Sequence, residues 1–283
     1  MQRSQYATEL IVAGLITLTT IAVAETKKEY RFEVGAKSKV SIINQFGSVS
    51  VKPSTGNSVI VNATTYSDRV EVDHAQSGNR VDVQSHLLSG ATAENARVDY
   101  EVLVPADASI DLESSTGPIH AERLHGDVEA EGANAPIDIR DIYGSHVHVK
   151  TMAGAITLTN IKDGHVEIDS VSGDVTLSSV TGPLVRVSST SGKIRYDGDF
   201  GYAGEYRFNS HSGDIDATIP EDASVDVKAQ SVHGKVQDDV PLQPKAHTSF
   251  LVKEGSSFAG TINKAASSVW LRTFSGKIHL KKR

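Results

Sequence analysis

The stretch Gly154 to Ser172 reads GAITLTNIKDGHVEIDSVS, and the chain begins the same phrase again at Gly173. Within this stretch two short runs, ITL and VEI, alternate apolar and polar residues on either side of a turn around Gly164. Alternation with a period of two is the pattern of a half-buried β-strand. The stretch therefore predicts one structural unit made of two short strands and two turns.

The unit recurs along the chain at a nearly constant step. The first apolar residue of the first run recurs after 18, 19, 19, 19, 21 and 21 residues, at Ile119, Ile137, Ile156, Val175, Ile194, Ile215 and Val236. The second run recurs after 18, 19, 19, 19, 21 and 19 residues, at Ile110, Val128, Val147, Val166, Val185, Tyr206 and Val225. A fixed period of this length indicates repeats that bury their apolar residues by stacking on their neighbours. We therefore predict an all-β fold, a parallel β-solenoid (β-helix-like) with coils of 18–21 residues and two short strands per coil.

One turn of each coil carries a glycine, at positions 117, 154, 173, 192, 213 and 234. Ala135 stands where the series expects another glycine. Glycine permits both a positive φ and a close approach between backbones. Because alanine replaces it in one coil, we expect that this turn does not need a positive φ in every coil.

The first 24 residues have the pattern of an export signal. Arg3 precedes an apolar run from Leu10 to Val23, and Ala22-Val23-Ala24 fits a cleavage site that would leave Glu25 as the mature start. The run is short for a membrane-spanning helix, so we expect no stable membrane span after cleavage. The chain has no cysteine, which excludes both disulfides and a lipid-bearing cysteine.

The remaining chain divides into three parts. Residues 25–104 alternate like strands but with irregular spacing, and we expect them to form an irregular N-terminal part of the solenoid. Residues 105–240 hold the regular repeats. Residues 241–283 are interrupted by Pro241 and Pro244 and predict irregular coils and a C-terminal cap that includes Trp270. In this cap Val269, Leu271, Ile278 and Leu280 are expected to close the last layer.

The charges are interspersed along the chain. The formal net charge is −7, and no basic stripe suited to nucleic acid is visible, so we expect no nucleic-acid partner. Stacking would place Asp174, Lys193, Asp214 and Lys235 in one column of alternating sign. Opposite charges on neighbouring strands stabilise their pairing, so we interpret the column as support for the register.

Several residue groups could carry chemistry. The pairs Asp214 with Asp216 and Asp138 with Asp141 could serve as the two carboxylates of a glycosidase, although acids two apart on a strand are ordinary on a solvated sheet. His146 and His148 share one strand face, but no third ligand follows at a recognisable spacing. We therefore predict no catalytic residue, no metal site and no cofactor.

Aromatic residues gather where the period stretches from 19 to 21. Tyr202, Tyr206 and Phe208 follow the insertion around 198–204, and we predict a binding surface there because loops on rigid repeats carry function. The alternative is that large side chains fill a wider coil.

The phrases of this chain resemble those of one bacterial family. They are INQFGSVSV at Ile43 to Val51, SIDLESSTG at Ser109 to Gly117, and the Ser-Gly phrases at Ser172, Ser191 and Ser275. The chain resembles, over residues 40–280, the exported β-strand-repeat family of unknown function whose members are often labelled "putative adhesin". The resemblance implies a β-solenoid of the cell envelope and no known catalytic residues.

These observations favour a non-catalytic exported protein, periplasmic, secreted or on the bacterial cell surface. It would act as an adhesin-like scaffold or binding module for an unknown protein or glycan, and self-association is a further expectation. The alternative is a polysaccharide-active enzyme with a carboxylate site on the same scaffold.

Overall fold

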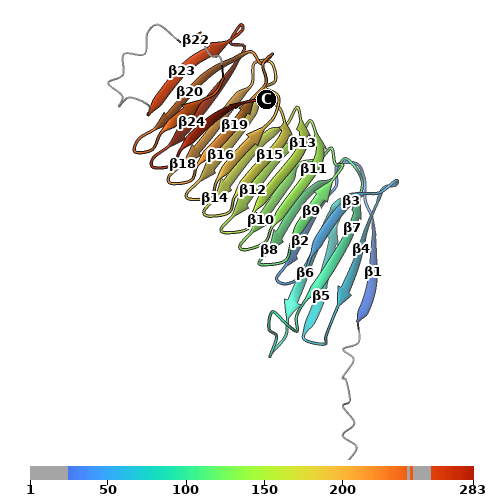
Figure 1. The fold of residues 1–283 in the computed structure, drawn as a ribbon. Helices are drawn as coiled ribbons and strands as arrows, with labels where there is room; N and C mark the ends of the chain where they lie inside the picture. Colours follow the sequence, from blue (N-terminus) through green and yellow to red (C-terminus); the bar gives the residue numbers. More distant parts are fainter. Residues whose placement is uncertain (1–24, 241–242, 245–255) are drawn as a thin grey trace, which may run out of the picture.

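A computed structural model describes residues 25–240, 243–244 and 256–283. The predicted signal segment lies outside the described part. So do Pro241 and, within the predicted irregular coils, Phe250 to Val252. The described chain is built of strands in two sheets, one of 12 and one of 13 strands, which face each other in an elongated body (Figure 1). No helix in the described ranges is long and apolar enough to cross a membrane.

The middle of the body consists of parallel coils, each with one strand in either sheet. The 13-stranded sheet contains β8 (Ser109–Ser114), β10 (Val128–Gly132), β12 (His146–Thr151), β14 (His165–Ser170), β16 (Leu184–Ser189) and β18 (Glu205–Ser210). The 12-stranded sheet contains β9 (Ile119–Glu122), β11 (Ile137–Tyr143), β13 (Ile156–Lys162), β15 (Val175–Val180), β17 (Ile194–Asp197) and β19 (Ile215–Ile219). This arrangement confirms the predicted solenoid with two short strands per coil.

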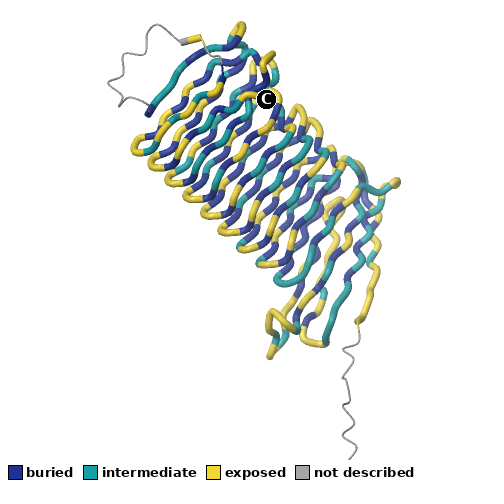
Figure 2. The backbone as a smooth tube through the Cα atoms, in the orientation of Figure 1, coloured by how far each residue is buried: buried dark blue, intermediate teal, exposed yellow. Residues whose placement is uncertain are grey.

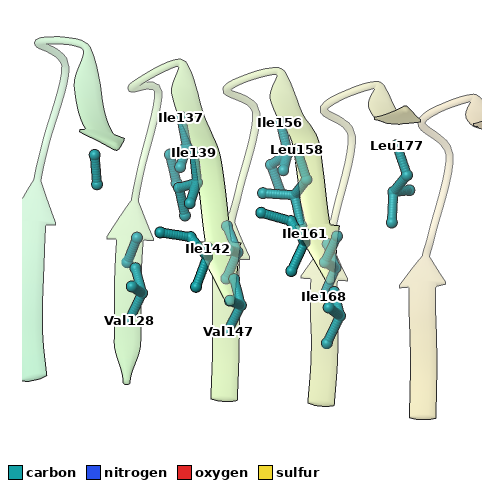
Figure 3. Packing of buried hydrophobic residues seen from close by; sticks show 14 of the residues in the cluster. Val128, Ile137, Ile139, Ile142, Val147, Ile156, Leu158, Ile161, Ile168 and Leu177 are labelled. Carbon is teal, nitrogen blue, oxygen red and sulfur yellow. The ribbon is translucent and has the colours of Figure 1, made fainter. Parts of the chain in front are cut away.

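The register of these coils is the one that the period predicts. Ile137 pairs with Ile156, Ile156 with Val175, and Val175 with Ile194, all in parallel. These side chains are no more than 1% exposed, and Figure 3 shows Ile137 and Ile156 at matching heights on adjacent strands. Alternate residues of each strand point outward and are exposed or half-buried (Figure 2).

A backbone bend adds a third apolar residue to several coils. Arg123, Asp141, Asn160 and Ser179 have φ values between 54° and 60°, at 59°, 56°, 56° and 55°. Such left-handed conformations are uncommon outside glycine and change the direction of the chain. The bend turns the following side chain back to the core, as with Ile142 and Ile161, which are both 0% exposed (Figure 3).

At Gly173 and Gly192 the turn needs glycine because successive coils are in close contact, and not because φ is positive. A Cβ on Gly173 would lie 1.9 Å from the carbonyl oxygen of Gly154, and a Cβ on Gly192 would lie 2.0 Å from that of Gly173. Neither glycine has a positive φ. At these two positions the backbones of successive coils approach too closely for a side chain. Because neither glycine has a positive φ, the expectation that this turn does not need one in every coil is confirmed.

At the N-terminal end, further strands cover the first coil, and the outermost of them pair antiparallel. The first coil consists of β2 (Lys39–Asn44) and β3 (Val49–Pro53), and it lies directly against β8 and β9. Beyond it lie β1 (Thr26–Glu33), β4 (Ser58–Thr65), β5 (Val70–Ser77), β6 (Arg80–Leu87) and β7 (Val98–Val104). The strands β1 and β4 pair antiparallel, as do β5 and β6, so the outermost layers at this end break the parallel pattern.

The C-terminal end corrects the predicted order. The last two strands, β24 (Ser267–Thr273) and β25 (Ile278–Lys282), do not form the cap. They insert between the coil of β18 and β19 and the coil of β20 (Val225–Ser231) and β21 (Val236–Asp238). The end layer is completed by β22 (Gln243–Pro244) and β23 (Ser257–Ile262), where β23 pairs antiparallel with β20. Figure 1 accordingly places the C-terminus beside the body of the rod rather than at its tip.

Three sequence predictions are therefore wrong at this end. Val236 does not follow Ile215 in the stack, because Ile278 pairs with both. Val225 is displaced along its strand, since Val227 takes the position next to Val269. Trp270 belongs to an interior coil instead of a cap.

Candidate functional site

The predicted aromatic surface is mostly core. Tyr206 and Phe208 are both 0% exposed, so the prediction that they form a binding surface is wrong. They point inward because they occupy the alternate positions of β18 that continue the apolar ladder from Val185 and Val187. Tyr202 is 91% exposed and remains a candidate contact residue.

The wider coil is filled by aromatic rings. Tyr196 lies 5.9 Å from Tyr206 and 4.9 Å from Phe208 between ring centroids, and Phe200 lies 4.9 Å from Tyr206. The hydroxyl of Tyr206 accepts a hydrogen bond from the Gly201 amide at 2.7 Å. Burial raises the pKa of Tyr206 and, more strongly, that of Tyr196. The insertion therefore holds large side chains in the core, as the alternative interpretation expected.

The candidate carboxylate pairs are engaged in ion pairs or backbone contacts. Asp216 lies 2.8 Å from the Lys193 ammonium and 3.0 Å from that of Lys281. Burial alone would raise the pKa of Asp216, but the hydrogen bonds from these lysines lower it below its ordinary value. Asp214 accepts a hydrogen bond from the Lys277 amide at 2.7 Å. These two acids hold neighbouring coils together.

The second carboxylate pair is separated by the bend in β11. Asp138 pairs with Arg140 at 2.7 Å, while Asp141 lies at the bend and accepts a hydrogen bond from the Asn160 amide. The two acids therefore have different neighbours and do not converge on a common hollow. The predicted charge column is also modified, because Lys277 rather than Lys235 follows Asp214.

The histidines lie on the outer face of the 13-stranded sheet. His146 lies 3.3 Å from Asp127, and His148 lies 3.7 Å from Glu129. Within the described ranges, no three His, Asp or Glu side chains lie close enough together to hold a metal ion.

The outer face of the 13-stranded sheet has a segregated charge pattern. Two outward rows, from β8 to β20 in spatial order, define what we call the charged face. Its residues are Asp111, Glu113, Glu129, Glu131, His148, Lys150, Glu167, Asp169, Arg186, Ser188, Arg207, Asn209, Trp270, Arg272, Lys228 and Gln230. The strands β8 and β10 contribute only acids to these rows, whereas β16, β18, β24 and β20 contribute only bases and neutral residues. A third row, at the strand starts, adds Asp127, Glu205 and Asp226.

The basic half of the charged face is centred on the inserted strand β24. Trp270 and Arg272 point outward from this strand, and Phe274 follows at the turn. Trp270 is 47% exposed and stands between the cations of two neighbouring strands, with the Lys228 nitrogen 4.6 Å and the Arg207 guanidinium 5.9 Å from the ring centroid. Cation–π attraction of this kind stabilises both charged side chains at the surface.

Apolar side chains continue along the turn beside this half. Phe274 is 44% and Val232 40% exposed, and the imidazole of His211 stacks on Phe274 with centroids 5.0 Å apart. Phe274 and Val232, together with Asn209, Ser210 and Arg272, line a groove of about 330 Å³. Exposed aromatic residues next to arginine are the composition that protein interaction sites favour.

The opposite sheet lacks such segregation. On β11 the acid Asp138 is neutralised by Arg140 of the same strand, and on β19 Asp216 is neutralised by Lys193 and Lys281. There each acid is paired with a base on its own strand or at a neighbouring strand. The separation of acids from bases is therefore a property of the charged face alone among the two outer faces described.

A larger depression of about 500 Å³ lies near the N-terminal strands. One of its acids, Asp99, is engaged within the protein, since it accepts hydrogen bonds from the Arg97 guanidinium, the Ser48 amide and the Tyr66 hydroxyl. Burial would raise the pKa of Asp99, but these hydrogen bonds outweigh it and hold the pKa below its ordinary value. Because Asp99 is satisfied within the protein, we regard the depression as structural and the charged face as the candidate site.

Part of the charged face could have been predicted from the sequence. The alternation in SSVWLRT, residues 267–273, indicates that Trp270 and Arg272 point outward, opposite to the buried Val269 and Leu271. What the sequence does not reveal is that Arg207 and Lys228 lie on either side, because that depends on the insertion of β24.

The fold and sequence agree with known proteins at two levels. No curated protein matches the chain. A solved structure of "a putative adhesin" from Bacteroides fragilis NCTC 9343 is similar, with 14% identity, a TM-score of 0.50, and coverage of 92% of this chain and 100% of the other. A "putative cell adhesion protein" from Clostridium sporogenes ATCC 15579 also matches, at 13% identity and a TM-score of 0.28, with coverage of 91% and 100%. The model of the family described as Toastrack DUF4097 matches residues 38–281, and the chain therefore belongs to this family.

Proposed function

We propose that the protein is a non-catalytic, adhesin-like binding module that is exported to the cell envelope and binds a protein or glycan through the charged face. The observation that carries the proposal is the exposed Trp270 among cations, beside exposed Phe274 and Val232. A rigid repeat presents such a face without rearrangement, which keeps the entropy cost of binding low. The "putative adhesin" label of the Bacteroides fragilis structure supports the same class.

The location is tested on the protein made by its own cells. We expect the chain in the envelope or secreted fraction, with Glu25 as its first residue after signal cleavage. Amino-terminal sequencing of the fractionated protein makes the measurement. A chain that keeps Met1 and stays with the cytosol would contradict export.

Binding is tested with the labelled chain on isolated cell envelopes, either untreated, protease-treated or oxidised with periodate. We expect saturable retention that falls at least about tenfold when Trp270→Ala and Phe274→Ala are combined, since buried aromatic contacts dominate interface energies. Loss after protease indicates a protein partner, and loss after periodate indicates a glycan. Tyr143→Ala is the control, because Tyr143 is 39% exposed on the opposite sheet.

Retention that is equal for the double variant and the control would refute the charged face as the binding site. The competing enzyme function is examined on the same material. Release of new sugar ends that vanishes in Asp214→Ala or Asp138→Ala would contradict a non-catalytic role.

A further inference from the structure

The charged face is complementary to itself when turned end for end. Its two outward rows begin with acids on β8 and β10 and finish with bases and neutral residues on β16, β18, β24 and β20. A two-fold rotation about a line along the strands, midway between β14 and β16, reverses the order of the coils and keeps each row opposite itself. It therefore sets the acidic half of one copy against the basic half of another.

We propose that the partner of this face is a second copy of the same chain, bound face to face with the two rods antiparallel. The proposal rests on the proposed function and names its partner. A closed two-fold dimer uses one patch on both copies, so a self-complementary patch is what such a dimer requires.

The rotation matches individual residues. Across the interface Asp111 lies opposite Lys228, Glu131 opposite Arg272, and Glu167 opposite Arg186. Arg272 has no ion-pair partner within the described ranges of its own chain, so it is available for this contact. Glu167 and Arg186 already pair within one chain at 3.0 Å, and in the dimer two such pairs meet at the axis.

Apolar side chains at the adjoining turn reinforce the match. Met152 is 64% and Val171 52% exposed, and both line a groove of about 410 Å³ that also reaches Glu131 and Gly132. The rotation brings Phe274 of one copy opposite the end of this groove in the other. The dimer would thus bury the exposed apolar residues of this turn together with the charges.

The size of the face is sufficient for a stable pair. Eight strands about 4.8 Å apart, with about five residues of 3.3 Å each, cover roughly 650 Å² per copy, or about 1,300 Å² in total. This value lies within the range of about 1,200–2,000 Å² that specific complexes bury.

The same pattern argues against two other occupants. A chain of one charge, such as an acidic polysaccharide, would match the basic half and be repelled by the acidic half. A peptide added as a further strand needs an open sheet edge, whereas the strands of the charged face are paired on both sides.

Sedimentation equilibrium of the purified chain tests the proposal. We expect a monomer–dimer equilibrium that weakens at least about tenfold between 0.05 and 0.5 M salt, because salt shortens the range of charge attraction. The variant Lys228→Glu with Arg272→Glu should be monomeric, and so should Asp111→Lys with Glu131→Lys. Mixing the two variants should restore a heterodimer, since each reversed half then faces an opposite charge.

The control pair is Lys235→Glu with Lys277→Glu, which makes the same change of charge on exposed residues directly before β21 and β25 of the opposite sheet and should leave the dimer intact. Circular dichroism melting checks that all variants fold. A strict monomer at every concentration, or a dimer unchanged by both reversals, overturns the inference. The inference is also overturned if envelopes of cells that lack the gene retain the chain through its charged face, or if the monomer binds polygalacturonate tightly. Either result leaves the proposed function standing.

Discussion

At the scale of the residue, the coil of β10 and β11 has Gly132 and Ala135 where other coils have a serine followed three residues later by a glycine. Ser114, Ser170 and Ser189 each donate a hydroxyl hydrogen bond to the carbonyl oxygen three residues later, at 2.7, 2.7 and 3.0 Å. In the coil of β10 and β11 the equivalent positions are Gly132 and Ala135. A Cβ on Gly132 would lie 3.1 Å from the Cβ of Ala135, so the methyl group of Ala135 occupies the space that a serine side chain takes elsewhere.

This arrangement predicts strong coupling between the two positions. Gly132→Ser alone should destabilise the fold by about 1–2 kcal/mol through overpacking, and Ala135→Gly alone by about 0.5–1 kcal/mol. The loss of stability in the double variant should be smaller than the sum of the two single losses by about 1 kcal/mol or more, because the hydroxyl–carbonyl hydrogen bond of the other coils then forms. Urea denaturation of the four proteins measures the coupling. Additive effects would show that the methyl and the hydroxyl do not share one space.

The residue scale also shows why the aromatic prediction failed. The register of Tyr206, which follows Val185 in the apolar series, predicted a buried side chain. Its aromatic character in an insertion suggested an exposed binding residue instead. The register decided, because reversing a strand's faces would move every apolar residue of that strand into water.

At the scale of the element, the inserted strand β25 is held by a shared acid. Asp216 on β19 lies beside the ammonium groups of Lys193, the residue before β17, and of Lys281 on β25, and its side chain is 17% exposed. A single carboxylate thus ties three neighbouring strands of the 12-stranded sheet. Two separate parts of the sequence meet at this acid.

This triad predicts a defined pH dependence. The pKa of Asp216 is lowered in the folded chain, so its contribution is present above the ordinary value of 3.8 and is lost as the pH falls below it. At pH 7, Asp216→Asn should cost about 1–2 kcal/mol of stability. Below pH 3 the melting temperatures of the variant and the original chain should converge, as scanning calorimetry would show. A constant difference from pH 7 to pH 2 would rule out the charge as the cause.

Element order was predictable only where neighbours in sequence are neighbours in space. The ladder from Ile119 to Ile215 follows from the period, since each coil stacks on the one before it. The slot after Ile215 could be filled by the strand of Val236 or by the strand of Ile278, because both carry the same apolar alternation. Local pattern cannot choose between them, and the choice also decides that Trp270 joins Arg207 and Lys228 on the charged face.

At the scale of the whole molecule, both ends carry antiparallel strands in their outermost layers. Beyond the coil of β2 and β3 lie β7, β4 and β1 in one sheet and β6 and β5 in the other, and beyond the coil of β24 and β25 lie β21 in one sheet and β20, β23 and β22 in the other. The pairs β4 with β1, β6 with β5, and β20 with β23 are antiparallel. The outermost strand β1 carries Lys27, Lys28 and Glu29 as exposed side chains, and charges of this kind discourage pairing with another chain at an open edge.

The layering predicts which amides are protected from hydrogen exchange. Those of β24 and β25 should exchange as slowly as those of β14 and β15, despite lying within twenty residues of the chain end, because they are bonded on both sides. The edge strands β1 and β22 should exchange first. Mass spectrometry of deuterated peptides resolves these segments, and fast exchange throughout 267–282 would contradict the insertion.

The insertion of β24 and β25 also bears on how the chain is made. A ribosome or a secretion channel delivers β18 to β21 first, yet the place between their two coils is filled only by β24 and β25, which come later in the chain. Assembly of that region must wait until β24 and β25 have been made, so a product truncated before them keeps bare strand edges that quality-control proteases can recognise. Until those two strands arrive, the rod has a gap between two coils that have already been synthesised.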